Sequence, residues 1–117
     1  MDWRPWAPVI GGGALLLSGS LLPLSGSARV PPVPALDALL HAGGFALLVG
    51  LGAVSVPKRR VSLLVGGAIA LAIGIEVAQT GVPGRRPEAI DVLADLIGIA
   101  LGLVAARIRN RAGATRL

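Results

Sequence analysis

Three pairs of polar side chains lie in stretches of this chain that are otherwise almost wholly apolar. The pairs are Asp37 with His41, Glu76 with Gln79, and Asp91 with Asp95. Carboxylates and an imidazole can exchange protons, and together with an amide they can hold a polar ligand. A carboxylate within a membrane-crossing segment costs about 3 kcal/mol, so such a residue is usually functional. These six residues are the first candidates for a functional site.

The segments that must position these residues are long enough to cross a membrane. Of the 117 residues, 54% are hydrophobic and 15% are charged, and the mean hydropathy of +0.79 lies outside the range of ordinary soluble domains. Each apolar stretch is near the roughly 20 residues that cross a bilayer core. We expect an all-α, polytopic membrane helix bundle of about four transmembrane helices, forming one domain over residues 1–117. The predicted spans are 6–24, 36–56, 61–82 and 90–108, with a basic tail at 107–117.

The first predicted span has a second interpretation. Gly26, Ser27 and Ala28 follow it and could form a signal-peptidase site. Against this, residues 1–4 carry no net side-chain charge, unlike the start of a signal peptide. Whether this span is retained or cleaved stays open, but in both cases the loop that contains Arg29 lies outside.

Basic residues are distributed unevenly between the two sides of the membrane. An even number of crossings places both termini and the loop at 57–60 on one side, which receives eight of the 11 Lys and Arg residues. Because basic loops are usually cytoplasmic, we expect cytoplasmic termini. The eight are Arg4, Lys58, Arg59, Arg60, Arg107, Arg109, Arg111 and Arg116; the other three are Arg29, Arg85 and Arg86. This topology brings all six polar residues to the outer side at one depth.

The net charge of +5 does not indicate a nucleic-acid partner. The chain has three aromatic residues in all, Trp3, Trp6 and Phe45, so its basic residues are not interleaved with stacking groups. They cluster instead at the termini and in short loops. Cysteine is absent, which excludes disulfides and thiolate metal sites and leaves the redox compartment unreadable.

Helical spacing predicts which way the polar residues point. Asp91, Asp95, Gly98, Gly102 and Ala106 share one face, acidic at its outer end and small below. Gly98 and Gly102 form a motif that lets membrane helices pack closely. The third span repeats this design, and the second approximates it. The residues are Ala68, Ala72, Glu76 and Gln79 on the third span, and Asp37, His41, Gly44 and Leu48 on the second.

Simpler interpretations exist for most of these residues. Asp91 and Asp95 could stabilise a helix N-terminus, and Asp37 could be an N-cap. His41 could be a packing residue, and Arg86 is best explained as a solvated loop charge. Glu76 has the weakest simple explanation, because a carboxylate in the middle of an apolar segment needs a partner or a proton.

The polar residues also resemble a known family. Glu76-Val-Ala-Gln79, Gly84-Arg85, Glu88, and Asp91-Val-Leu-Ala-Asp95-Leu-Ile-Gly98 with Gly102, preceded by Asp37 and His41-Ala-Gly-Gly-Phe45, resemble the VanZ-like family of small bacterial membrane proteins, over about residues 36–103. The resemblance implies a bacterial cytoplasmic membrane protein linked to the cell envelope and to low-level teicoplanin (glycopeptide) resistance. It implies that Asp37, His41, Glu76, Gln79, Arg85 and Asp91 occupy the family's recurring polar positions. Asp95 departs from the asparagine usual there, and we expect it to bind a cation, share a proton or pair with Arg85.

Three functions fit this pattern. In the first, the outer pocket binds or modifies an amphipathic envelope molecule: Glu76, His41 and Asp91 would transfer protons, Arg85 would hold an anionic head, and Gln79, Asp37, Asp95 and Glu88 would complete the pocket. Membrane lipids or a lipid-linked molecule would be its partners. The second is a proton relay or small-solute transporter, and the third a non-catalytic accessory protein. Whether the protein is an enzyme stays open. No cofactor is expected, although Asp37 and His41 are spaced to share a divalent cation.

Overall fold

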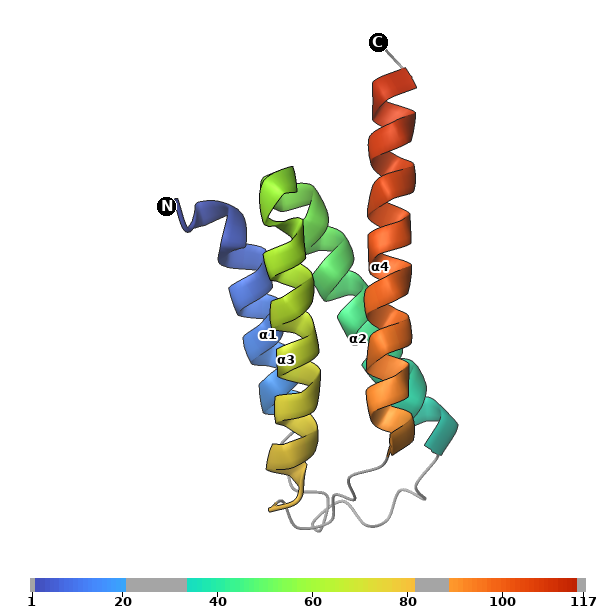
Figure 1. Cartoon of the computed structure of the whole chain (residues 1–117). Coiled ribbons are helices and arrows are strands. Elements are labelled where there is room, and N and C mark those ends of the chain that lie inside the picture. Colours follow the sequence, from blue (N-terminus) through green and yellow to red (C-terminus); the bar gives the residue numbers. More distant parts are fainter. Residues whose placement is uncertain (1, 21–33, 82–88, 116–117) are drawn as a thin grey trace.

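A computed structural model of the chain describes residues 2–20, 34–81 and 89–115, and every regular element in these ranges is helical. The all-α prediction is therefore confirmed for the described part of the chain. The elements are the 3₁₀ turn η1 (Arg4–Trp6), α1 (Ala7–Ser20), α2 (Pro34–Ser55), the 3₁₀ turn η3 (Lys58–Arg60), α3 (Val61–Gln79) and α4 (Ala89–Thr115) (Figure 1).

Three of the four helices are long and apolar enough to cross a membrane. The qualifying segments are Ala38–Ser55 of α2, Lys58–Gln79 of η3 and α3, and Ala89–Ala112 of α4. The 14 described residues of α1 extend only about 21 Å, less than a bilayer core of about 30 Å. The end of the predicted first span and the candidate cleavage site lie outside the described residues. Among the described residues, three helices are therefore long and apolar enough to span a membrane, and the predicted count of four is not confirmed.

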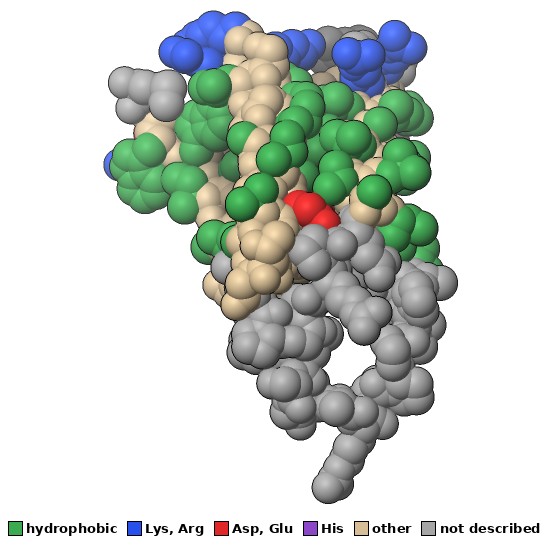
Figure 2. Space-filling model, turned by 60° about the horizontal axis from the view of Figure 1, so that its bottom comes forward, with side chains coloured by type: hydrophobic (Ala, Val, Ile, Leu, Met, Phe, Trp, Pro, Cys, Tyr) green, Lys and Arg blue, Asp and Glu red, His purple; other side chains and the backbone are tan. Residues whose placement is uncertain are grey.

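The helices alternate in direction, so that both ends of the chain and η3 lie at the same end of the bundle (Figure 1). Figure 2 shows the Lys and Arg side chains at this end, which we call the basic end, and a broad hydrophobic surface around the helices. Large apolar side chains such as Leu47, Ile73 and Leu101 are more than half exposed. Soluble monomers rarely expose apolar surface on this scale, whereas lipid would cover it.

Helix α2 packs most extensively against α4, and small residues make the contact. A Cβ atom added to Gly98 would overlap the carbonyl oxygen of Ala42, and one added to Gly102 would lie 2.5 Å from the carbonyl oxygen of Ala46 and 2.8 Å from the backbone nitrogen of Gly50. The two backbones therefore touch directly, as the predicted small-residue motif requires. We call Ala42, Ala46, Gly50, Gly98 and Gly102 the small-residue seam.

Helix α1 packs on a different face of α2. Gly44 and Gly52 leave room there for Leu16 and Val9, whose side chains would collide with an added Cβ at 2.5 and 2.8 Å. The hydroxyl of Ser55 donates a hydrogen bond of 2.8 Å to the carbonyl oxygen of Pro5 and ties α2 to η1, directly before α1, at the basic end. Helix α2 is therefore the centre of the bundle, between α1 and α4.

The helix boundaries differ from the predicted ones in ways the residues explain. Helix α4 runs to Thr115 rather than to residue 108, because alanine and arginine favour helix and continue it past the apolar stretch. The predicted basic tail is thus helical as far as it is described. Helix α3 ends at Gln79, three residues early, and a turn follows at Thr80. Helix α2 begins at Pro34, because proline suits the first turn of a helix.

Candidate functional site

A histidine from α2 and an aspartate from α4 form a buried pair at the end of the bundle opposite the basic end. The Nδ1 atom of His41 lies 2.8 Å from Oδ1 of Asp95. Only 7% of His41 and 1% of Asp95 are exposed. A buried carboxylate and imidazole at this distance form a strong hydrogen bond, which orients the ring. Any further proton exchange by the ring must then use Nε2.

The pair sits where it does because the small-residue seam sets the register between α2 and α4. His41 immediately precedes Ala42, and Asp95 lies three residues before Gly98, which contacts Ala42. The close approach of the two backbones therefore brings the short side chain of Asp95 within reach of the ring. The three expectations for Asp95 did not name His41 as its partner, and they stay predictions.

Asp91 continues the same face of α4 toward its N-terminus. It lies in the first turn of the helix and is 5% exposed. The N-terminal helix dipole stabilises a carboxylate at that position, as the simpler interpretation of Asp91 requires. Burial next to the turn that carries Asp95 goes beyond what a capping role needs, because a cap works equally well at a solvated surface. Asp91 and Asp95 thus place two acidic groups one turn apart.

Helix α3 contributes Gln79, which is 2% exposed. Its Nε2 donates a hydrogen bond of 2.9 Å to the carbonyl oxygen of Ser20 at the end of α1. Its Oε1 is buried and accepts no hydrogen bond from the described residues. Leaving such an acceptor unsatisfied costs about 1 to 3 kcal/mol, which a ligand hydroxyl or N–H group would recover. We call His41, Gln79, Asp91 and Asp95 the polar layer.

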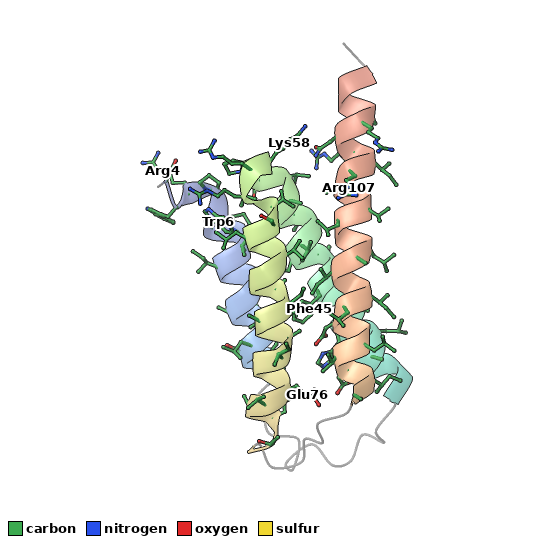
Figure 3. The ribbon with its side chains drawn as sticks, viewed as in Figure 1. Arg4, Trp6, Phe45, Lys58, Glu76 and Arg107 are labelled. Atoms are coloured by element: carbon green, nitrogen blue, oxygen red, sulfur yellow. The ribbon has the colours of Figure 1, made fainter. Side chains whose placement is uncertain are left out.

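Glu76 lies one turn before Gln79 and is partly exposed. Figure 3 shows it near the end of α3, far from Arg4, Lys58 and Arg107 at the basic end. The free-energy cost of burying a carboxylate in the membrane is smaller at Glu76 than at the middle of a span, because α3 ends only three residues later.

An apolar layer closes the site toward the middle of the bundle. Phe45, Ile75 and Ile99 are at most 4% exposed and belong to one hydrophobic cluster. Each lies one helical turn from a residue of the polar layer. Phe45 follows His41, Ile99 follows Asp95, and Ile75 precedes Gln79. This cluster lies between the polar layer and the basic end.

Several predicted site residues are not placed. Arg85 and Glu88 lie outside the described residues, as does the side chain of Asp37. The backbone of Asp37 belongs to α2, whose start at Pro34 puts this residue inside the helix rather than at the N-cap position. The predicted cluster of Glu76, Arg85 and Asp91 is therefore described only for its two acidic members.

The described residues contain no group of three or more His, Asp or Glu side chains arranged to hold a metal ion. His41 uses one ring nitrogen on Asp95, and the shared cation site predicted with Asp37 involves a side chain outside the described set. The chemistry that the described site offers is hydrogen bonding and proton transfer.

The Ala42, Ala46 and Gly50 stripe is the feature that sequence reasoning missed. Its four-residue spacing was a readable signal, because it matches the spacing of Gly98 and Gly102 on the partner helix. In the observed register Ala42 lies against Gly98, and His41 reaches Asp95.

Comparison of the chain with models of known protein families, with curated proteins and with solved structures found no match. The resemblance to the VanZ-like family stays a prediction that rests on the quoted residues.

Proposed function

We propose that this protein is a VanZ-like integral membrane protein whose polar layer forms the floor of a pocket at the extracytoplasmic membrane face, where it binds or modifies an amphipathic cell-envelope molecule. The observation that carries the proposal is the buried His41–Asp95 pair within a layer of four buried polar side chains, at one end of an otherwise apolar bundle. Buried polar groups in membrane helices are costly and usually serve binding or proton transfer.

The proposed orientation of the protein in the membrane rests on the distribution of charge. Arg4, Lys58 and Arg107 lie at the basic end (Figure 3), and basic segments usually stay in the cytoplasm. Both η1 and the end of α4 lie at this end, as an even number of crossings requires, and the prediction of a span at 6–24 supplies the fourth crossing. The polar layer then faces outward.

Labelling tests this sidedness directly, because the chain has no cysteine. Thr80 and Arg59 are both exposed and lie near opposite ends of α3. An impermeant maleimide should label Thr80→Cys in intact cells and Arg59→Cys only after permeabilisation. The reverse pattern would put the polar layer on the cytoplasmic side and refute the proposal.

The proposed ligand has a polar head and an apolar tail. The head would use the carboxylates of Glu76 and Asp91, the Oε1 of Gln79 and the guanidinium of Arg85, which suits a phosphate or carboxylate. The tail would lie along apolar side chains that face lipid, such as Val77 and Leu93. Lipid-linked wall precursors and lipoglycopeptides have this construction. The link to glycopeptide resistance rests on the family resemblance alone.

One observation also favours a proton relay, because a buried imidazole–carboxylate pair can pass a proton. The apolar cluster of Phe45, Ile75 and Ile99 weighs against it, since these side chains carry no group that could pass the proton onward. An accessory role, in which the pair merely joins α2 to α4, predicts that no ligand binds.

The test is ligand binding to the purified full-length protein in lipid nanodiscs. Teicoplanin and the same glycopeptide without its acyl chain would be titrated onto wild type, Asp91→Asn and the control Thr80→Val, whose side chain is exposed at the same end. We expect tail-dependent binding by wild type and the control, weakened about tenfold in Asp91→Asn by loss of one charge-assisted contact. Absence of saturable binding, or equal binding by Asp91→Asn, would contradict the role of the polar layer toward this ligand.

A further inference from the structure

A cavity of about 420 Å³ lies at the basic end, away from the polar layer. It opens between the last turns of α4 and the connection from α2 to α3. Its apolar wall consists of Ala53, Val61, Leu103 and Ala106, and its polar wall of Lys58, Arg107, Asn110 and Arg111. Its volume is within the range of small-molecule sites.

The sequence of α4 explains why the helices separate here. Small residues at every fourth position let α4 touch α2 as far as Ala106. The next position on that face is Asn110, flanked by Arg107 and Arg111, and these longer side chains no longer allow close approach. On the opposite wall, η3 turns the chain after Pro57 and presents Lys58. The cavity is thus walled by hydrocarbon on one side and by cations on the other.

Among the described residues, the cavity is lined by three basic side chains, Lys58, Arg107 and Arg111, and by no acidic one. Among the described residues of the basic end, Asp2 is the one acidic residue. Its carboxylate accepts a hydrogen bond of 3.0 Å from the backbone nitrogen of Arg4. Converging Lys and Arg side chains bind phosphate oxygens well, Arg through a planar fork and Lys through a compact charge.

The position of the cavity selects the source of the phosphate. The candidate membrane-crossing segment of η3 and α3 begins at Lys58, and that of α4 ends at Ala112. If these segments cross the membrane, the cavity lies at the level of lipid headgroups. Its apolar wall of Ala53, Val61, Leu103 and Ala106 offers hydrocarbon against which an acyl chain can lie. We propose that this cavity is a binding site for the phosphate headgroup of an anionic phospholipid from the leaflet at the basic end. The inference is independent of the function assigned to the polar layer.

The test measures lipid binding to the purified full-length protein by native mass spectrometry, with phosphatidylglycerol and phosphatidylcholine of the same acyl chains. The variant K58Q/R107Q removes two cations from the lining, and R59Q/R109Q removes two exposed cations of the same end that do not line the cavity. We expect preference for phosphatidylglycerol, weakened roughly 30-fold in K58Q/R107Q and less than threefold in the control. Detergent melting of both variants verifies the fold.

A second variant separates shape from charge. Asn110→Trp would fill the cavity without changing the net charge, and it should displace phosphatidylglycerol as strongly as K58Q/R107Q does. Equal loss in the two double variants would mean diffuse attraction to the basic end and overturn the proposal. Unchanged binding in K58Q/R107Q or Asn110→Trp would overturn it as well. Displacement of the lipid by millimolar inorganic phosphate would assign the site to a free anion instead.

Discussion

The interface between α2 and α4 is built from two opposite kinds of residue along its length. In the small-residue seam, backbone touches backbone and no polar side chain takes part. One turn further toward the end opposite the basic end, His41 and Asp95 meet through a single hydrogen bond. Van der Waals contact in the seam is available to any sequence with small residues, whereas a buried carboxylate is expensive to retain. The seam therefore provides the close packing of α2 on α4, and we propose that the polar layer serves the function of the protein.

The largest expected effect follows from breaking the seam. Gly102→Leu would place a side chain against the backbone of Ala46 and Gly50, neither of which can move without shifting α2. Overpacking usually costs about 1 to 3 kcal/mol, and contact with backbone puts this site at or above the upper value. We expect loss of monodisperse protein on size-exclusion chromatography in detergent.

A matched glycine provides the control for this prediction. Gly66 in α3 has open space around an added Cβ, so Gly66→Leu should leave the elution profile and the melting temperature nearly unchanged. Wild-type behaviour of Gly102→Leu would mean that α4 does not pack on α2 as described.

An intermediate effect is expected from breaking the polar pair. Asp95→Leu leaves a buried imidazole nitrogen without its acceptor, which should lower the free energy of unfolding by about 2 to 3 kcal/mol. Asp95→Asn keeps an acceptor oxygen at the same place and should cost about 1 kcal/mol or less. The asparagine is also the residue that the VanZ-like family usually has.

A double-mutant cycle sharpens this result. His41→Leu combined with Asp95→Leu replaces both partners by apolar groups, so the double variant should be more stable than the sum of the single changes by at least about 1 kcal/mol. Additive effects, measured by denaturation in detergent, would show that the two side chains do not interact.

The helices and their main contact face could be predicted from sequence because membrane segments have a strong compositional signal and helical faces follow from spacing. Gly98, Gly102 and Ala106 were assigned to the packing face of α4 in this way, and all three are buried. The pairing of His41 with Asp95 could not be read from either helix alone, since it depends on the relative register of α2 and α4. The extent of α4 to Thr115 was missed because hydropathy marks where a span ends, not where the helix ends.

The contribution of α1 was also beyond sequence reasoning. The hydrogen bond from Gln79 to Ser20 depends on where α1 ends relative to α3, which no local pattern encodes. The consequence for the site is specific, because this bond uses the donor of Gln79 and leaves its buried Oε1 as an acceptor.

The central claim, that the outer end of this bundle is a functional site, is tested most directly by Glu76→Gln in a strain that depends on the protein. The amide keeps the shape of the side chain and removes its charge and its titratable proton. The assay compares glycopeptide and envelope-stress sensitivity with membrane abundance and detergent melting, using the exposed neighbour Thr80→Val as control. We predict loss of function in Glu76→Gln at normal abundance and near-normal melting, with the control unaffected. Normal function of Glu76→Gln at normal abundance would contradict the claim and favour an accessory role for the protein.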